Sequence, residues 1–304
     1  MYEDINIQWF PGHMTKANRM IASNLKMVDA ICEVIDARIP YSSRNPDLDA
    51  IAGGKPRLII LNRTDQADPE ATKQWNRFFK AGGAIVLETD CKSGKGVGTF
   101  PAAVRSLLAS KMASYSAKGQ TGRLPRLMVV GIPNVGKSSL INKVAKRKAA
   151  ATSDKPGVTR GKQWISLDNG IELLDTPGVL WPKFDDSAVA ENLAFTGAIR
   201  DDVIDIETLA MNFMARMQAD YPSRIADRYK IDATSCSDGH ALLSQAASNR
   251  GFLLPGGALD ITRMAIILLD EFRGGKLGRI TLERADGGYS RPVGATHIPP
   301  SDAT

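Results

Sequence analysis

Cysteine and histidine are scarce in this sequence of 304 residues, which contains three of each. The cysteines, Cys32, Cys91 and Cys236, lie far apart in the chain. No two of them have the spacing of a metal site or of a redox-active pair. This scarcity excludes a cysteine-bound metal and a disulfide framework, and it predicts reduced thiols in a cytosol.

Long apolar runs are also missing. The longest run near the end, Met264–Leu269, is far short of the roughly 20 apolar residues that cross a bilayer. The first residues, Met-Tyr-Glu-Asp-Ile-Asn, lack the basic region and the apolar core of a signal peptide. We therefore expect a cytoplasmic protein that does not associate with membranes.

The composition is that of a globular protein with a sizeable core, because 43% of the residues are hydrophobic and 24% are charged. The length is enough for one large domain and a smaller one. Lysine and arginine outnumber aspartate and glutamate by 39 to 33, a net charge of +6. This modest excess suits an anionic partner such as nucleic acid but does not identify one.

Segments of strand and helix character alternate over the first 112 residues. Such alternation predicts βαβ crossovers and a mostly parallel sheet. Residues 113–124 are small and polar, and we expect an exposed connector there. The predicted strands are 30–35, 57–61 and 84–87, and the predicted helices are 14–28, 69–80 and 97–112.

The stretch Gly131–Ser139 has the pattern G-x-x-x-x-G-K-[ST] between an apolar run and a helix predicted to end near residue 148. In this context the backbone N–H groups of the loop point at an anion. Gly131 and Gly136 permit the close approach that a Cβ would block. Lys137 would reach the β- and γ-phosphates, and the Ser138 hydroxyl would bind Mg²⁺. The alternative is a tight turn that binds nothing.

Two further elements follow this loop. Residues 163–167 and 171–174 are predicted to form a hairpin that ends in Asp175-Thr-Pro-Gly178. A carboxylate there would hold Mg²⁺ through water, and the Gly178 N–H can sense a γ-phosphate. Thr159, in the loop between, is a candidate for a second hydroxyl on Mg²⁺, or else an ordinary loop threonine.

Asn62-Arg-Thr-Asp65 follows a predicted strand and is close to the guanine motif [NT]-K-x-D. A carboxylate at Asp65 can accept hydrogen bonds from two donors of guanine that adenine lacks. Arg63 replaces the usual lysine; its stem can cover the base, although the two side chains are not equivalent. Alternatively, Asp65 only caps a helix. The loop after the next strand contains Asp90 and Cys91, which would contact the base.

The parts of a GTPase are therefore present in rotated order, with base recognition before the phosphate loop. This order resembles that of the circularly permuted GTPases, and within them those that act in ribosome biogenesis. The resemblance spans about residues 7–284. The segments that carry it, besides those above, are Trp-Phe-Pro-Gly-His-Met at 9–14, Asp-Ala-Arg-Ile-Pro at 36–40, Pro-Gly-Val-Thr at 156–159 and Asp-Thr-Pro-Gly-Val-Leu-Trp-Pro-Lys-Phe at 175–184.

The resemblance implies a circularly permuted α/β P-loop GTPase domain with a doubly wound, mostly parallel sheet. We expect this domain over residues 1–184, an all-α RNA-binding domain over 185–284 and a disordered tail over 285–304. The residues expected to bind GTP or GDP are Asn62, Arg63, Asp65, Asp90, Cys91, Asn134, Val135, Gly136, Lys137, Ser138, Ser139, Thr159 and Gly178, and those expected to hold Mg²⁺ are Ser138, Thr159 and Asp175.

Activation of water is the open point. In many GTPases a glutamine after Asp-x-x-Gly orients the attacking water, but here Val179 stands at that position. The resemblance places a catalytic histidine at His13, which by its sequence alone could equally be a surface or capping residue. Asn134 suggests K⁺ beside the phosphates, as in related GTPases, or simple turn chemistry. The expected catalytic residues are His13, Lys137 and Asn134.

The function that the resemblance implies is GTP hydrolysis as a switch in late assembly of the large (50S) ribosomal subunit, stimulated by the ribosome. The expected partners of this monomeric protein are the large subunit and its ribosomal RNA. Two alternatives stay open: a GTP-sensing RNA-binding scaffold with little turnover, and a GTPase of a small-subunit or tRNA pathway. A metabolic P-loop kinase is disfavoured, because no acceptor-binding segment is visible. The arginines and lysines of the last domain could contact RNA or simply be solvated.

Overall fold

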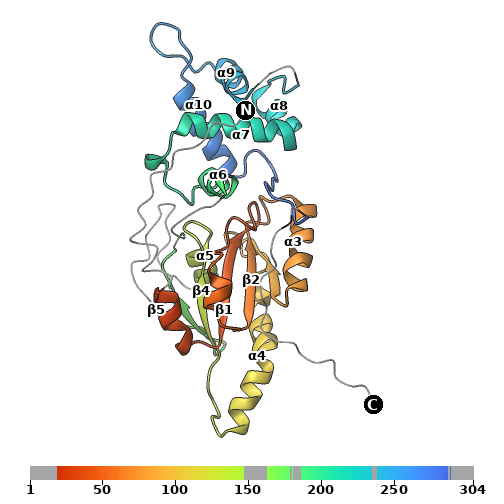
Figure 1. Ribbon diagram of the computed structural model, residues 1–304, viewed down its shortest axis with the longest axis vertical. Helices are drawn as coiled ribbons and strands as arrows, with labels where there is room; N and C mark the ends of the chain where they lie inside the picture. The colour runs from red at the N-terminus through yellow and green to blue at the C-terminus, as the bar shows by residue number, and fades with distance from the viewer. Residues whose placement is uncertain are drawn as a thin grey trace.

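The computed structural model describes residues 19–146, 163–178, 180, 186–234, 238–286 and 288 (Figure 1). Six strands form one sheet in the order β3-β2-β1-β4-β6-β5. All neighbours are parallel except β5, which runs antiparallel to β6 at the edge. The strands are β1 (Ala30–Asp36), β2 (Arg57–Asn62), β3 (Ile85–Glu88), β4 (Arg126–Val130), β5 (Gln163–Ser166) and β6 (Glu172–Asp175).

Helices cover both faces of the sheet, so β1 and β2 are buried along their whole length. On one face, Val104 and Leu108 of α4 and Leu140 of α5 pack on alternate strand residues. On the other, residues 19–27 and α3 do so. The helices of this part are α2 (Leu48–Ile51), α3 (Pro69–Ala81), α4 (Phe100–Ala117) and α5 (Lys137–Val144), with short 3₁₀ turns at Leu25–Met27 and Val97–Thr99.

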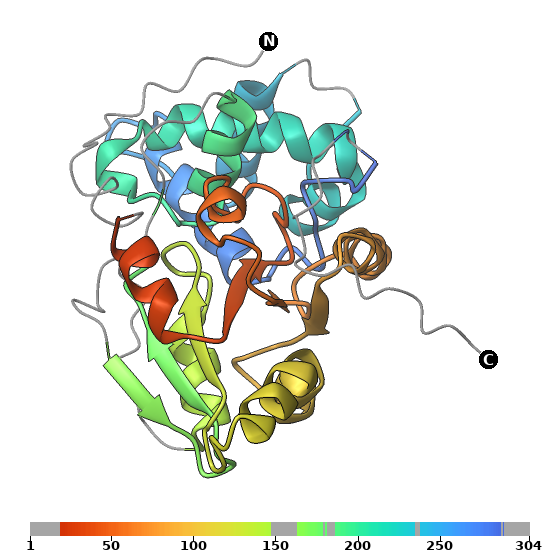
Figure 2. The same ribbon diagram turned by 60° about the horizontal axis from the view of Figure 1, so that its bottom comes forward.

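The remaining helices are stacked at one end of the sheet (Figures 1 and 2). Phe213, on the central helix α7, lies between Phe195 and Phe272, with ring centroids 5.0 and 4.7 Å away. The apolar core of these helices is continuous with the core under α4 and α5. They are α6 (Ser187–Phe195), α7 (Ile206–Asp220), α8 (Pro222–Tyr229), α9 (Gly239–Asn249) and α10 (Ile261–Arg273), with a 3₁₀ turn at Asp201–Val203.

After α10 the chain returns to the sheet part, and we call residues 279–284 the return segment. The N–H of Ile280 donates to the Gln66 carbonyl at 2.9 Å, and the N–H of Leu282 donates to the Arg38 carbonyl at 2.8 Å. The return segment runs beside α3 in both views. The predicted helical domain comprises residues 185–284, and its last residues thus pack on the sheet part. The division into two domains stays a prediction.

Two predicted elements differ from the structure. The helix predicted to end at residue 112 continues to Ala117, because Ala-Ser-Tyr-Ser-Ala contains no helix breaker before Gly119. Five residues of the predicted connector 113–124 are therefore helical. Helix α5 ends at Val144 rather than near 148. Within the described part of the chain, no helix combines the length and the apolar character that a membrane crossing needs.

Candidate functional site

The predicted site residues gather at the edge of the sheet where the parallel strands end. Asp36 ends β1, Asn62 ends β2 and Asp175 ends β6, while the loop with the G-x-x-x-x-G-K-[ST] pattern follows β4. Asp36 is in register with Asn62, and Asp175 with Val129. In doubly wound sheets, ligands bind at this edge, beside the point where the strand order reverses.

Glycine is required at two positions of the phosphate loop. At Gly131 an added Cβ would lie 2.4 Å from the Val34 carbonyl oxygen of the neighbouring strand β1. Gly136 has φ +102°, and a Cβ there would lie 2.2 Å from the Asn62 Nδ2. Helix α5 begins directly after Gly136, so the N–H groups of its first turn open towards the loop.

Lys137 is buried inside this loop. Its Nζ donates to the carbonyls of Gly131 and Ile132 at 2.9 and 2.8 Å. Burial lowers its pKa to about 8, although the nearby Asp175 opposes that shift. A buried ammonium group at the start of α5 is suited to phosphate oxygens, whose negative charge would add to that of Asp175.

Asp175 fits the role of a Mg²⁺ carboxylate. Its Oδ1 is buried and has no hydrogen-bond partner. Burial raises the pKa of Asp175 to about 6, more than the attraction of Lys137 lowers it. A bound cation would satisfy this oxygen, with Ser138 in the first turn of α5 as a second ligand. Among the described residues there is no group of three His, Cys, Asp or Glu for a metal; Mg²⁺ commonly takes one or two carboxylates plus substrate phosphates.

Gly178 lies against the phosphate loop. A Cβ at this position would be 2.6 Å from the Nζ of Lys137 and 3.0 Å from the Cα of Pro133. Its backbone is therefore close to the loop that would hold the phosphates; contact of the Gly178 N–H with a γ-phosphate stays a prediction. His13, Thr159 and Val179 lie outside the described residues, so their predicted roles stay predictions.

Asn62 links the three predicted nucleotide-binding segments. Its Nδ2 donates to the Val135 carbonyl of the phosphate loop at 2.7 Å. Its Oδ1 accepts from the backbone N–H of Cys91 at 3.0 Å, in the loop after β3. The side chain is buried, with both polar ends used. The sequence places Asn62 in the base motif; the structure adds that it holds the phosphate loop and the Cys91 loop together.

Asn62→Ala tests this link. The variant leaves the buried N–H of Cys91 and carbonyl of Val135 without partners, so we expect about 2 kcal/mol less stability and roughly tenfold weaker GDP binding. Urea unfolding and titration with fluorescent GDP measure the two effects. The matched control is Asn76→Ala, which removes an exposed bond to Glu88. Equal GDP affinity of the two variants would contradict the role of Asn62.

Arg63 also contacts the phosphate loop. It has φ +62°, and its Nη2 donates to the Asn134 carbonyl at 2.8 Å. Its Nε lies 3.6 Å from the Asp36 Oδ2, and its Nη1 donates to the Arg273 carbonyl at the end of α10 at 3.5 Å. The arginine that replaces the usual lysine thus bridges the base motif, the phosphate loop and the helical part.

Asp65 is exposed in the turn before α3. The residue that caps α3 is Asp68, whose carboxylate accepts from the N–H groups of Glu70 and Ala71. The capping alternative for Asp65 is therefore wrong, and its carboxylate remains suited to a ligand. In the loop after β3, burial favours a higher pKa for Asp90, but hydrogen bonds from Ser93 and Lys92 hold it below its usual range. The buried thiol of Cys91 has a pKa raised to about 11.

Asn134 has φ +58°, and its Nδ2 donates to the Gly197 carbonyl just beyond α6 at 2.8 Å. The phosphate loop is therefore bonded to the helical part. The side chain lies at the loop that would hold the phosphates, but K⁺ coordination by Asn134 stays a prediction.

Asp36 and Arg38 were not among the expected site residues. They form a buried ion pair, with Nη2 and Oδ2 2.8 Å apart. Burial favours a higher pKa for Asp36, but Arg38 holds it below the usual range. Arg38 also donates to the Phe272 carbonyl at 3.3 Å. The sequence feature that could have revealed this pair is Asp-Ala-Arg-Ile-Pro, which places two charged residues at the end of a buried strand.

Comparisons with known proteins identify the family of this chain. Residues 126–219 match the family described as 50S ribosome-binding GTPase. Ribosome biogenesis GTPase A of Bacillus cereus is 45% identical over 277 residues, which are 91% of this chain and 93% of that protein. Mitochondrial ribosome-associated GTPase 1 of Mus musculus is 33% identical, covering 91% of this chain and 90% of that protein.

The fold also matches a solved structure. The crystal structure of GNP-bound YlqF from T. maritima superposes with a TM-score of 0.62 at 31% identity, over 89% of this chain and 99% of that one. The predicted α/β fold, with a permuted P-loop domain followed by helices, is confirmed.

Proposed function

This chain belongs to the ribosome biogenesis GTPase A family, and on that premise we propose that it acts as a switch in late assembly of the large ribosomal subunit. It is a GTP hydrolase, as the family and its relatives are. The observation that carries the proposal is the side chain of Asn62, which joins the base motif to the phosphate loop 73 positions further on. This bond supports a guanine nucleotide site built from segments in rotated order, because it brings those segments together.

The residues of the site have different roles in phosphoryl transfer. The first turn of α5 and Lys137 hold the β- and γ-phosphates, and Asp65 selects guanine. Asp175 and Ser138 would hold Mg²⁺, which neutralises charge on the phosphate oxygens when bound. Because the chemistry needs mainly positioning and charge stabilisation, a buried Lys137 contributes most where water is excluded.

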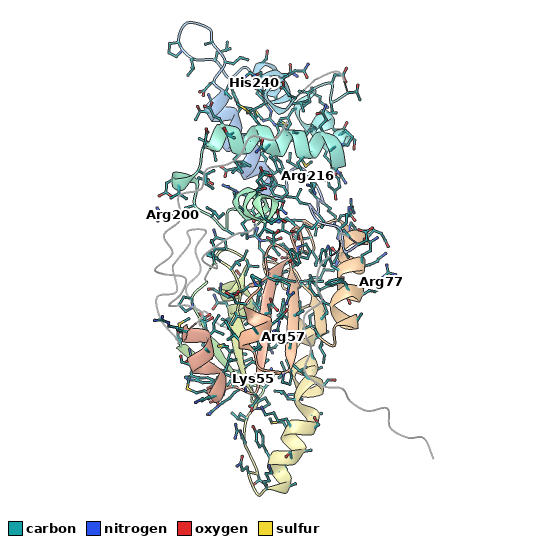
Figure 3. All side chains as sticks on the ribbon, in the orientation of Figure 1. Lys55, Arg57, Arg77, Arg200, Arg216 and His240 are labelled. Carbon is teal, nitrogen blue, oxygen red and sulfur yellow. The ribbon has the colours of Figure 1, made fainter. Side chains whose placement is uncertain are left out.

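His13 is proposed as the residue that orients the attacking water, since a valine follows Asp-x-x-Gly. We expect His13→Ala to keep GDP affinity and to lose about 100-fold in ribosome-stimulated turnover, within the usual range for a positioned acid or base. Phosphate release with purified large subunits measures this effect. His240→Ala, on the exposed surface of α9 (Figure 3), is the matched control. Unchanged stimulated turnover of His13→Ala would remove this residue from the mechanism.

The proposed partners are the large subunit and its ribosomal RNA. We propose that the protein is a cytoplasmic monomer, and that K⁺ bound at Asn134 provides further electrostatic stabilisation. Several cations of the helical part are used within the molecule. Arg228 and Arg250 pair with Glu271, and Arg273 pairs with Asp201. RNA contact by the remaining cations would make binding strongly dependent on salt.

Sedimentation tests the proposal. The full chain is mixed with purified large or small subunits, in the presence of GDP or a non-hydrolysable GTP analogue. We expect co-sedimentation with large subunits in the GTP state and weaker binding with GDP. Binding to small subunits alone would favour another RNA pathway. Binding without stimulated phosphate release would favour a GTP-sensing scaffold.

A further inference from the structure

The turn that carries Asp65 is held in place by the return segment. The guanidinium of Arg279 donates through Nη2 to the Thr64 carbonyl at 2.8 Å and through Nε to the Ala67 carbonyl at 3.0 Å. The N–H of Ile280 donates to the carbonyl between them, that of Gln66, at 2.9 Å. Arg279 therefore bonds to the turn on both sides of Asp65, from a position 215 residues after Thr64.

Thr281 fixes the end of the same turn. Its Oγ1 accepts from the N–H of Asp68 at 3.0 Å and donates to the Ala37 carbonyl at 3.2 Å. The backbone of Thr281 is held in turn by the Tyr221 hydroxyl, which donates to its carbonyl at 2.9 Å. The return segment is thus itself anchored, at the junction of α7 and α8.

These bonds hold the backbone around Asp65 and so determine where its carboxylate lies, although none of them is made by that carboxylate. The carboxylate is exposed and takes part in none of them. A carboxylate distinguishes guanine by two hydrogen bonds, which require a fixed position relative to the base. An exposed turn with no support of its own would lose conformational entropy each time a base bound.

We propose that Arg279 is a positioning residue for guanine recognition, and that the return segment presets the turn of Asp65 for the base. This inference rests on the guanine-binding role proposed for Asp65. It makes base selectivity depend on the segment that follows α10. By linkage, a partner that moves this segment changes nucleotide affinity, and the nucleotide changes affinity for that partner by the same factor.

The test compares GDP with inosine diphosphate, which lacks the exocyclic amine. We expect Arg279→Ala to bind GDP about tenfold more weakly and to lose less affinity for inosine diphosphate, because inosine diphosphate keeps the N1–H donor but has only one bond to Asp65 to lose. Arg279→Lys, which keeps the charge but lacks the forked guanidinium whose two nitrogens bond to the two carbonyls, should lie between the wild type and Arg279→Ala. Arg77→Ala, on the exposed side of α3 (Figure 3), is the matched control and should leave both affinities unchanged.

The outcomes distinguish the positioning role of Arg279 from the guanine-binding role of Asp65. Equal weakening of both nucleotides in Arg279→Ala and in Arg279→Lys, or no weakening, would overturn the positioning role. If Asp65→Ala also bound GDP like the wild type, the guanine assignment itself would fall. Asp65→Ala could still prefer GDP over inosine diphosphate while Arg279→Ala loses that preference. This result would overturn the positioning of Asp65 and place the base contact at another residue. Thermal melting of each variant shows that the comparison is made on folded protein.

Discussion

Gly136→Ala is expected to bind GTP and GDP at least about 30-fold more weakly than the wild type. The new Cβ would lie 2.2 Å from the Asn62 Nδ2, at a φ of +102° that disfavours a side chain. Overpacking of a buried site costs about 1–3 kcal/mol, and left-handed backbone about 1–2 kcal/mol more. The added methyl group displaces Asn62, so it disturbs the phosphate loop, the base motif and the Cys91 loop together. Titration with fluorescent nucleotides measures the loss.

The matched control for this variant is Gly98→Ala. Gly98 lies in the 3₁₀ turn before α4 and would place a Cβ in open space, with no atom within 4 Å. It should bind nucleotides like the wild type. If the two alanine variants had the same affinity, the close approach of Gly136 to Asn62 would not be needed for binding.

Glu283→Ala is expected to lower the free energy of unfolding by about 3–5 kcal/mol. The Glu283 carboxyl group is buried, and its oxygens accept from the N–H groups of Tyr41 and Ser42 at 2.6 and 3.0 Å, from the Ser42 hydroxyl, and from the Asn192 amide at 3.1 Å. It therefore joins the loop after β1, helix α6 and the return segment. Its removal leaves several buried donors unpaired, which is the costly case. Urea unfolding at neutral pH measures the loss, and an unchanged midpoint would contradict it.

Glu283 also makes stability depend on pH. Burial outweighs its hydrogen bonds and raises its pKa from 4.5 to about 7. Between these values the unfolded chain has released the proton and the folded chain keeps it. The contribution of Glu283 is thus fully present below pH 4.5 and is lost as the pH rises to about 7, a decrease of about 3 kcal/mol. Glu283→Gln should remove this slope; parallel curves for the wild type and Glu283→Gln would count against it.

The sequence predicted the sheet part well because its signals are local. The buried strand Ala30–Asp36 is apolar except for Glu33 and its last residue, and the phosphate loop is defined by glycines and a lysine within nine residues. Asp65 could likewise be assigned from its distance to Asn62. These predictions depend on periodicity and on the chemistry of neighbouring residues, which one sequence contains.

The contacts between the two parts could not be predicted in this way. Arg279 was included among the cations available to RNA, yet its guanidinium bonds to Thr64 and Ala67. Glu283 falls near the end of the chain, where the sequence becomes rich in glycine and polar residues, yet it is fully buried. Nothing in the spacing of residues reveals partners more than 200 positions apart, because such pairs depend on the tertiary fold.

The central place of β4 in the sheet has a consequence for the continuity of the chain. This strand pairs with β1 on one side and β6 on the other, although the exposed residues 118–124 precede it. A proteolytic cut in that stretch would divide the base motif and the phosphate loop between two fragments. The fragments would stay joined by strand pairing and by the apolar core, so a nicked molecule should elute as one species and still bind nucleotide. The nucleotide site would thus depend on the packing of the strand ends, and it would not need a continuous chain between the base motif and the phosphate loop.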